Sequence, residues 1–121
     1  MDVFVYGTLR AGEPNHSYLA ACTRLLSCAR VPGFVLYDLG PFPAACPAPE
    51  GRDGVLGELY RVTQDATLAM LDQLEGYPEL YDRGEVRVLD PQEGVWPARM
   101  YFMHRPPQSG RPIPGGDWLR E

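Results

Sequence analysis

The residue with the clearest chemical potential is an acid that shares a helix face with leucines. Leu68, Leu71 and Leu74 fall on one stripe when residues advance by about 100° each, as in an α-helix. Glu75 follows Leu71 by one helical turn and therefore lies within the same stripe. A carboxylate that faces a protein core is costly unless it is paired or functional. The spacing thus makes Glu75 a candidate general acid/base.

The place of Glu75 in the last helical turn strengthens this expectation. Burial and the negative end of the helix dipole both disfavour the charged form, so the pKa should rise. A carboxyl that exchanges protons near pH 7 needs a shift of roughly 2–3 units from about 4.3. The dipole supplies at most about 1 kcal/mol, so desolvation must provide most of the shift. The alternative is a solvated helix cap, which periodicity alone favours.

A second candidate is the turn Tyr6-Gly7-Thr8-Leu9, which follows an apolar strand directly. We expect Gly7 to adopt a backbone conformation closed to other residues and to let a ligand approach. Successive backbone N–H groups in such a turn form a concave anion site, which suits the carboxylate of a small substrate. Arg10 either adds positive charge to this site or lies on the surface. The alternative is an ordinary turn from strand to loop.

The elements that would position these residues are mostly strands. Alternating or apolar runs predict strands at 2–6, 55–62, 81–89 and 95–104, with the last two forming a hairpin around the turn at 90–94. Two extended pieces within 24–39 are separated by Pro32-Gly33, a short helix is expected at 16–22, and the proline-rich segment 40–54 is expected to be an irregular loop. One clear helix should begin after an N-cap at Thr63 and end near Glu75, where Gly76 and Pro78 stop it. This order predicts a small mixed α/β (α+β) fold around a twisted or closed sheet.

Composition limits the classes of function. The chain has 121 residues, which suits a single domain spanning 1–121, and 45% of them are hydrophobic. Its net charge of -5 argues against a nucleic-acid partner, and no apolar run approaches a membrane span of about 20 residues. The N-terminus lacks the basic region of a signal peptide, so we expect a cytoplasmic protein. Three cysteines without a CxxC pair predict reduced structural thiols and no metal site, and no pattern indicates an oligomeric state.

Several motifs, taken in order, resemble those of the gamma-glutamylcyclotransferase-like family. The motifs are Tyr6-Gly7-Thr8-Leu9, Gly12-Glu13-Pro14-Asn15-His16, Gly57-Glu58-Leu59-Tyr60, Leu71-Asp72-Gln73-Leu74-Glu75 and Tyr81-Asp82-Arg83. The second and the last look closest to the branch that acts on gamma-glutamylamines. The ending Gly116-Asp117-Trp118-Leu119 looks like that of small bacterial members.

This resemblance implies a twisted β-barrel with flanking helices and an enzyme without a cofactor. The implied substrate is a small gamma-glutamyl compound whose α-amine attacks its own γ-carbonyl. The products are 5-oxoproline and a released amine or amino acid. Glu75 matches the family's catalytic acid, Tyr6, Gly7, Thr8 and Leu9 would bind the gamma-glutamyl group, and Tyr81 and Tyr101 match positions that line the cavity.

The sequence contains no nucleophile elbow, HExxH motif or P-loop. This agrees with a reaction in which the nucleophile comes from the substrate itself. Two alternatives stay open: a non-catalytic module that binds a small carboxylate in the same cavity, and an amide hydrolase in which Glu75 activates water.

The other conspicuous side chains have structural interpretations. We expect His16 and His104 to be non-catalytic, Asn15 to organise its loop, Asp72 and Glu79 to be solvated, Trp118 to fold the tail back, and Phe34, Tyr37, Tyr60 and Phe102 to pack in the core.

Overall fold

The fold is known from a computed structural model, which describes residues 1–49 and 54–120. Two 3-10 helices, η1 (His16–Leu19) and η2 (Trp118–Arg120), accompany one α-helix, α1 (Asp65–Leu74). The strands in chain order are β1 (Asp2–Val5), β2 (Thr23–Val31), β3 (Phe34–Asp38), β4 (Pro43–Pro47), β5 (Val55–Arg61), β6 (Asp82–Leu89), β7 (Val95–Phe102) and β8 (Arg111–Pro112). Among these described residues, no helix combines the length and the apolar character needed to cross a membrane.

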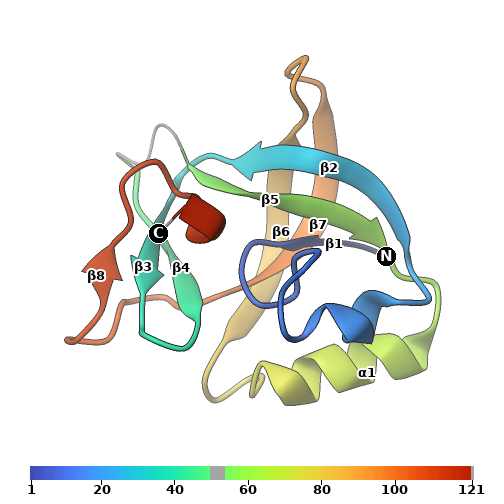
Figure 1. Cartoon of the computed structure of the whole chain (residues 1–121), viewed down its shortest axis with the longest axis horizontal. Coiled ribbons are helices and arrows are strands. Elements are labelled where there is room, and N and C mark those ends of the chain that lie inside the picture. The colour runs from blue at the N-terminus through green and yellow to red at the C-terminus, as the bar shows by residue number, and fades with distance from the viewer. Residues whose placement is uncertain (50–53, 121) are drawn as a thin grey trace.

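Five strands close into a barrel in the order β1-β5-β2-β6-β7. Figure 1 labels these strands, which curve around a common centre. The pairing is antiparallel except between β1 and β7, which run parallel with Val3 opposite Arg99. The apolar residues of β1 point to both sides of the strand, and Val3, Phe4 and Val5 are all buried. β1 is therefore covered on two faces, which explains why its sequence is continuously apolar. The predicted α+β barrel is confirmed.

A small second sheet, β4-β3-β8, lies beside the barrel. The prediction of an irregular loop at 40–54 was wrong for Pro43–Pro47, which pair along the full length of β3. Proline cannot donate a hydrogen bond, but β4 is an edge strand, where one side of the backbone needs no partner. The prolines at its two ends therefore hide a strand from pattern analysis. Residues 50–53 of the predicted loop lie outside the described residues.

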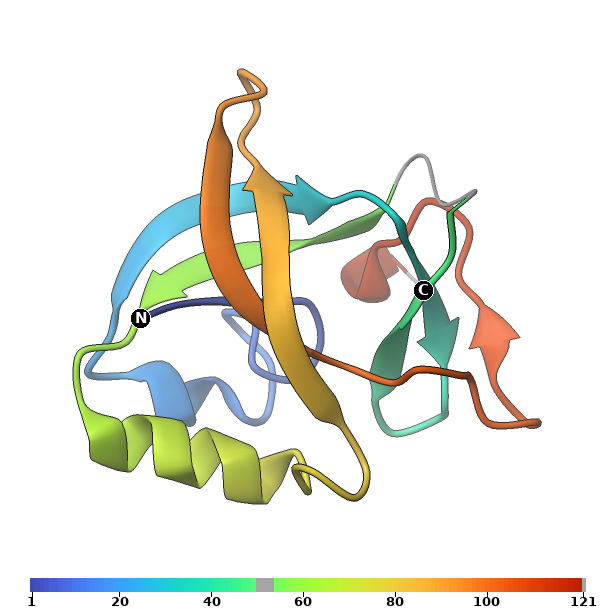
Figure 2. The ribbon, with the colours of Figure 1, turned by 180° about the vertical axis from the view of Figure 1, so that it is seen from behind.

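Helix α1 packs below the barrel together with η1 (Figures 1 and 2). Leu71 is fully buried, and Leu68 and Leu74 pack against the same core, as the stripe predicted. The predicted N-cap at Thr63 was wrong, because the N-cap is Gln64 and its side chain makes no capping hydrogen bond. The predicted stop is confirmed: Glu75 is the C-cap and Gly76 has a φ of 63°.

The remaining expectations for the chain are mostly confirmed. The helix expected at 16–22 is a single 3-10 turn, η1, and the hairpin β6–β7 forms around Asp90–Gly94. Trp118 brings the tail back against the barrel core. All three cysteines are free; Cys46 is buried, but Cys28 is exposed on β2 and so does not pack as expected.

Candidate functional site

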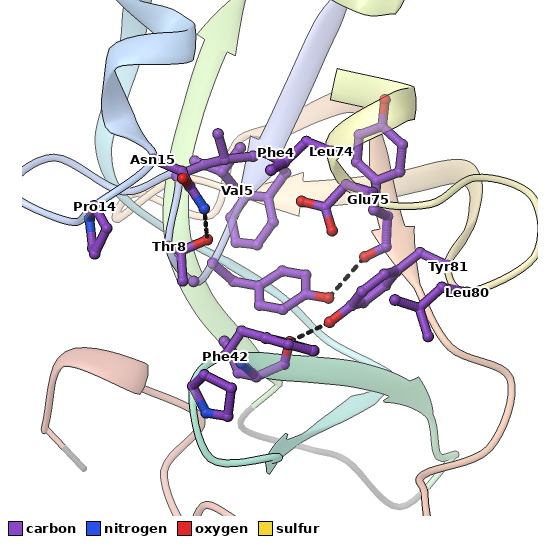
Figure 3. A pocket seen from close by; sticks show the side chains of 16 residues that line it. Phe4, Val5, Thr8, Pro14, Asn15, Phe42, Leu74, Glu75, Leu80 and Tyr81 are labelled. Atoms are coloured by element: carbon purple, nitrogen blue, oxygen red, sulfur yellow. Dashed lines mark hydrogen bonds between the residues drawn. The ribbon is translucent and has the colours of Figure 1, made fainter. Parts of the chain in front are cut away.

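A single cavity brings together all seven residues that the sequence singled out for binding or catalysis. Its volume is about 380 Å³, within the range of small-molecule sites. It opens between the start of the loop after β1, the end of α1 and the turn before β4 (Figure 3). The residues that line it are Phe4, Val5, Tyr6, Gly7, Thr8, Leu9, Pro14, Asn15, Pro41, Phe42, Pro43, Leu74, Glu75, Leu80, Tyr81 and Tyr101.

Glu75 extends from the end of α1 into this cavity (Figure 3). Its backbone N–H donates to the carbonyl of Leu71 at 2.9 Å, so the residue completes the last helical turn. The carboxyl makes no hydrogen bond with any other described residue and remains available to a ligand. Burial raises the pKa of Glu75 to about 7. Glu75 is thus a helix cap, as the alternative proposed, but a largely buried one, and desolvation is the cause of the shift, as expected.

The turn after β1 forms the opposite wall. Asn15 Nδ2 donates to Thr8 Oγ1 at 3.0 Å, and the Asn15 backbone N–H donates to the Thr8 carbonyl at 2.9 Å. Because its oxygen accepts from Asn15, the Thr8 hydroxyl is free to donate its own proton into the cavity. The backbone N–H groups of Thr8 and Leu9 are also free to donate, because they have no acceptor among the described residues. This wall therefore contains hydrogen-bond donors that have no partner among the described residues, as an anion site requires.

Gly7 is required for a different reason from the one predicted. Its φ is not positive, so the backbone conformation itself is open to other residues. A Cβ at this position would instead lie 2.7 Å from Pro43 Cγ. The glycine thus permits close contact between the turn and the start of β4.

Arg10 neither lies on the surface nor reaches the cavity, so both expectations for it were wrong. Its side chain is buried, and Nε lies 3.2 Å from Glu58 Oε2 while NH1 lies 2.9 Å from Asp117 Oδ1. Glu58 also accepts hydrogen bonds from the Ala11 N–H and the Tyr60 hydroxyl. Burial alone would raise the pKa of Glu58, but the hydrogen bonds from Ala11, Tyr60 and Arg10 hold it below its usual range.

Two tyrosine hydroxyls in the cavity have their protons committed to the backbone. The Tyr6 hydroxyl donates to the Tyr101 carbonyl at 2.9 Å and accepts from the Ala45 N–H at 3.1 Å. The Tyr81 hydroxyl donates to the Pro43 carbonyl at 2.7 Å. Burial is the main cause that raises the pKa of both phenols, so both remain protonated at neutral pH. Towards the cavity, Tyr81 can therefore only accept hydrogen bonds.

The third tyrosine is held by a charged pair on the outside of the cavity. The Tyr101 hydroxyl donates to Asp72 Oδ1 at 2.7 Å, and Asp72 Oδ2 pairs with Arg83. Arg83 also lies over the ring of Tyr77, 4.3 Å from its centroid. The expectation that Asp72 is only solvated was wrong, because a residue that faces off the leucine stripe meets β6 and β7.

Sequence reasoning missed the wall formed by Pro41, Phe42 and Pro43. These residues belong to the proline-rich segment, whose only local signal was its composition. Of the histidines, His16 bonds through Nδ1 to the Leu9 carbonyl at 3.0 Å and His104 pairs with Asp82, and neither lines the cavity. The described residues contain no group of three His, Cys, Asp or Glu side chains that could hold a metal ion.

A family model and several similar proteins show the family of this chain. The model of the family described as "Gamma-glutamyl cyclotransferase, AIG2-like" matches residues 3–120. The chain is 36% identical to the Escherichia coli K12 "Gamma-glutamylcyclotransferase family protein YtfP" over 98% of this chain and 96% of that protein. It is 34% identical to the zebrafish "Gamma-glutamylaminecyclotransferase A" over 73% of this chain and 58% of that protein. The crystal structure of an AIG2-like protein of Mus musculus has a TM-score of 0.72 at 27% identity and covers 88% of this chain and 79% of that chain.

Proposed function

The chain belongs to the gamma-glutamyl cyclotransferase, AIG2-like family, and we propose that its cavity converts a gamma-glutamyl group to 5-oxoproline with release of an amine or amino acid. The observation that carries the proposal is the placement of Glu75. An uncompensated carboxyl with a pKa of about 7 faces the same cavity as a wall of hydrogen-bond donors. A protein that only binds the carboxylate of a ligand gains nothing from the additional carboxyl group of Glu75 in the same cavity.

The two ends of the cavity suit the two charges of an amino-acid head group. The α-carboxylate of the substrate would accept hydrogen bonds from the N–H groups of Thr8 and Leu9 and from the Thr8 hydroxyl. The α-ammonium would donate to Glu75 and to the Tyr81 hydroxyl, which has only acceptor capacity left. This assignment orients the gamma-glutamyl group with its amine next to the acid.

In the proposed reaction, Glu75 takes a proton from the α-ammonium group. The freed amine nitrogen attacks the γ-carbonyl carbon of the same molecule and forms a five-membered ring. The bond from that carbon to the leaving nitrogen then breaks as Glu75 returns its proton to the leaving nitrogen. The ring nitrogen loses its second proton to the released amine, so the products are 5-oxoproline with a neutral lactam and an ammonium ion. The ring-closing nucleophile belongs to the substrate. Holding the gamma-glutamyl group in a bent conformation, with its amine next to the γ-carbonyl, therefore supplies much of the rate acceleration.

The raised pKa of Glu75 suits this exchange of protons. The α-amino group is a stronger base than a carboxylate, and each unit by which the two pKa values differ costs about 1.4 kcal/mol in the proton transfer. A rise in the pKa of Glu75 from about 4.3 to about 7 therefore lowers the cost of the same transfer by about 4 kcal/mol. Burial of Glu75 therefore removes much of the cost of the first step.

The mouth of the cavity favours a leaving group with an apolar part. Pro14, Phe42 and Leu80 belong to the lining, and Pro14 and Leu80 are exposed at the surface. They would contact the carbon chain of the departing amine. We therefore propose gamma-glutamylamines as the first substrates to test, in line with the name of the zebrafish relative.

The test is a screen of gamma-glutamylamines, gamma-glutamyl amino acids and the gamma-glutamyl-ε-lysine isopeptide, with products identified by mass spectrometry. We expect 5-oxoproline, and Glu75→Gln should abolish its release while leaving the fold intact. Glu79→Gln is the matched control, because Glu79 is an exposed acid just beyond the same helix. Free glutamate would indicate a hydrolase, and full turnover by Glu75→Gln would refute the role of the acid.

A further inference from the structure

The C-terminal tail lies against the loop that forms one wall of the cavity (Figures 1 and 2). Asp117 Oδ1 accepts a hydrogen bond from Arg10 NH1 at 2.9 Å. Trp118 Nε1 donates to Glu13 Oε1 at 3.1 Å. The tail is itself attached to the barrel, because the Gly116 carbonyl accepts from the Leu56 N–H of β5 at 2.8 Å. The loop is thus held between the barrel and the last residues of the chain.

Arg10 is the centre of this attachment. It is only 8% exposed and lies between Glu58 on β5 and Asp117 in the tail, and Glu58 is only 4% exposed. A buried guanidinium between two carboxylates has a well-defined position, because moving away from either would break a charge-assisted hydrogen bond. The position of the loop therefore depends on β5 and on the tail together.

The loop has two sides with different partners. Thr8, Leu9 and Asn15 line the cavity, whereas Arg10 and Glu13 turn away from it and contact the tail or the barrel. A shift on the outer side moves the donors on the inner side, since both belong to one short segment. Hydrogen-bond donors must lie within a few tenths of an ångström of their best positions to bind a carboxylate well.

We propose that Asp117 and Trp118 are positioning residues for the substrate, acting through Arg10 and Glu13 on the carboxylate-binding wall. The inference rests on the proposed function, because it takes that wall as the binding site of the α-carboxylate. Neither residue lines the cavity or reaches Glu75. Their loss should therefore weaken substrate binding and leave the chemical step unchanged.

The experiment compares three variants of the full chain with a gamma-glutamyl substrate that the wild type cyclises. Asp117→Ala removes the tail's contact with Arg10, and Trp118→Phe keeps an apolar ring but removes the N–H that reaches Glu13. We expect KM to rise by about three- to tenfold in each, with kcat within about twofold of wild type. Asp117→Asn keeps an acceptor oxygen for Arg10 and should restore much of the lost affinity.

Hydrogen–deuterium exchange gives a second measurement that needs no substrate. Within residues 8–15, the hydrogen-bonded amides of Arg10, Glu13 and Asn15 should exchange about tenfold faster in Asp117→Ala and Trp118→Phe. Glu93→Ala is the control, because it removes an exposed ion pair with Arg30 at the end of the β6–β7 hairpin, and it should alter neither KM nor this exchange.

The outcomes separate this proposal from the proposed function. Unchanged KM together with unchanged exchange in both tail variants would overturn the positioning role. A fall in kcat at constant KM would also overturn it. If the wild type cyclises no gamma-glutamyl compound, the proposed function fails, whereas faster exchange at residues 8–15 would still support the attachment and unchanged exchange would refute it.

Discussion

Glu75 shows how one position can receive an unusual pKa from its surroundings. It ends a helix whose leucine stripe faces the core, so its side chain leaves the helix towards the interior. The interior at this place is a cavity and not packed side chains, so the carboxyl is desolvated without a partner. The same residue at an outward position would have an ordinary carboxyl. The raised pKa of Glu75 is therefore a consequence of its angular position on the helix, which directs its side chain inward.

The dependence of turnover on pH should report this residue directly. A general base must be ionised in the free enzyme, so kcat/KM should fall about tenfold per pH unit below pH 7. The α-ammonium of the substrate stays protonated over that range and adds no slope of its own. The measurement is kcat/KM from pH 5 to pH 8 with one gamma-glutamyl substrate. A flat profile between pH 5 and pH 7 would exclude Glu75 as the base.

At the scale of elements, the sequence predicted those whose apolar pattern is local. β1, β5, α1 and the β6–β7 hairpin were expected close to their observed bounds, because alternation or a leucine stripe marks each of them. β4 was missed because its prolines mimic a loop, and β8 was missed because it has only two residues. These elements form through pairing with β3, which is a tertiary interaction that no local pattern records.

The contact between the turn after β1 and the start of β4 can be tested at Gly7. The added methyl group of Gly7→Ala would overlap the ring of Pro43, whose carbonyl holds the Tyr81 hydroxyl. We expect a shift of this wall and a loss of substrate affinity of about tenfold or more. Titration calorimetry with 5-oxoproline measures the effect.

Gly12→Ala is the matched control in the same loop. A Cβ there meets no atom within 4 Å, although the φ of 85° makes the residue strained by about 1 kcal/mol. This variant should lose some stability but keep its affinity for 5-oxoproline. Equal losses of affinity in the two variants would mean that backbone strain, and not the contact with Pro43, governs the turn.

At the scale of the whole molecule, the candidate site is assembled from segments far apart in the chain. The acid and the turn were singled out because their motifs occur in the order of the family, although each local pattern alone is weak, and the structure places both on one cavity. The sequence could not identify the clamp of Asp72 and Arg83 on Tyr101, nor the contacts of Arg10 with Glu58 and Asp117. Those pairs join residues that look like ordinary surface charges until the barrel closes.

The stability of the whole chain should carry the signature of its buried acid. The pKa of Glu75 rises from about 4.5 when unfolded to about 7 when folded, so the folded state binds more protons between these values. This contribution to stability is fully present below pH 4.5 and is lost as the pH rises through 7, a change of about 3 kcal/mol. Glu58 has the opposite sign: its lowered pKa makes its contribution disappear only in more acidic solution. The free energy of unfolding should therefore be greatest near pH 5.

Glu75→Gln removes the titrating group while nearly keeping its shape. At pH 8 this variant should be more stable than wild type by about 3 kcal/mol, because it no longer buries a charge, and the difference should vanish near pH 4.5. Urea unfolding at pH 4.5, 6, 7 and 8 measures both proteins, with Glu79→Gln as the exposed control that should follow wild type. Parallel pH dependences for wild type and Glu75→Gln would show that the carboxyl is solvated in the native state. The cavity would then hold an acid with an ordinary pKa, and that pKa would no longer be close to the pKa of the substrate amine. Burial of Glu75 is responsible both for the pH dependence of stability and for the raised pKa.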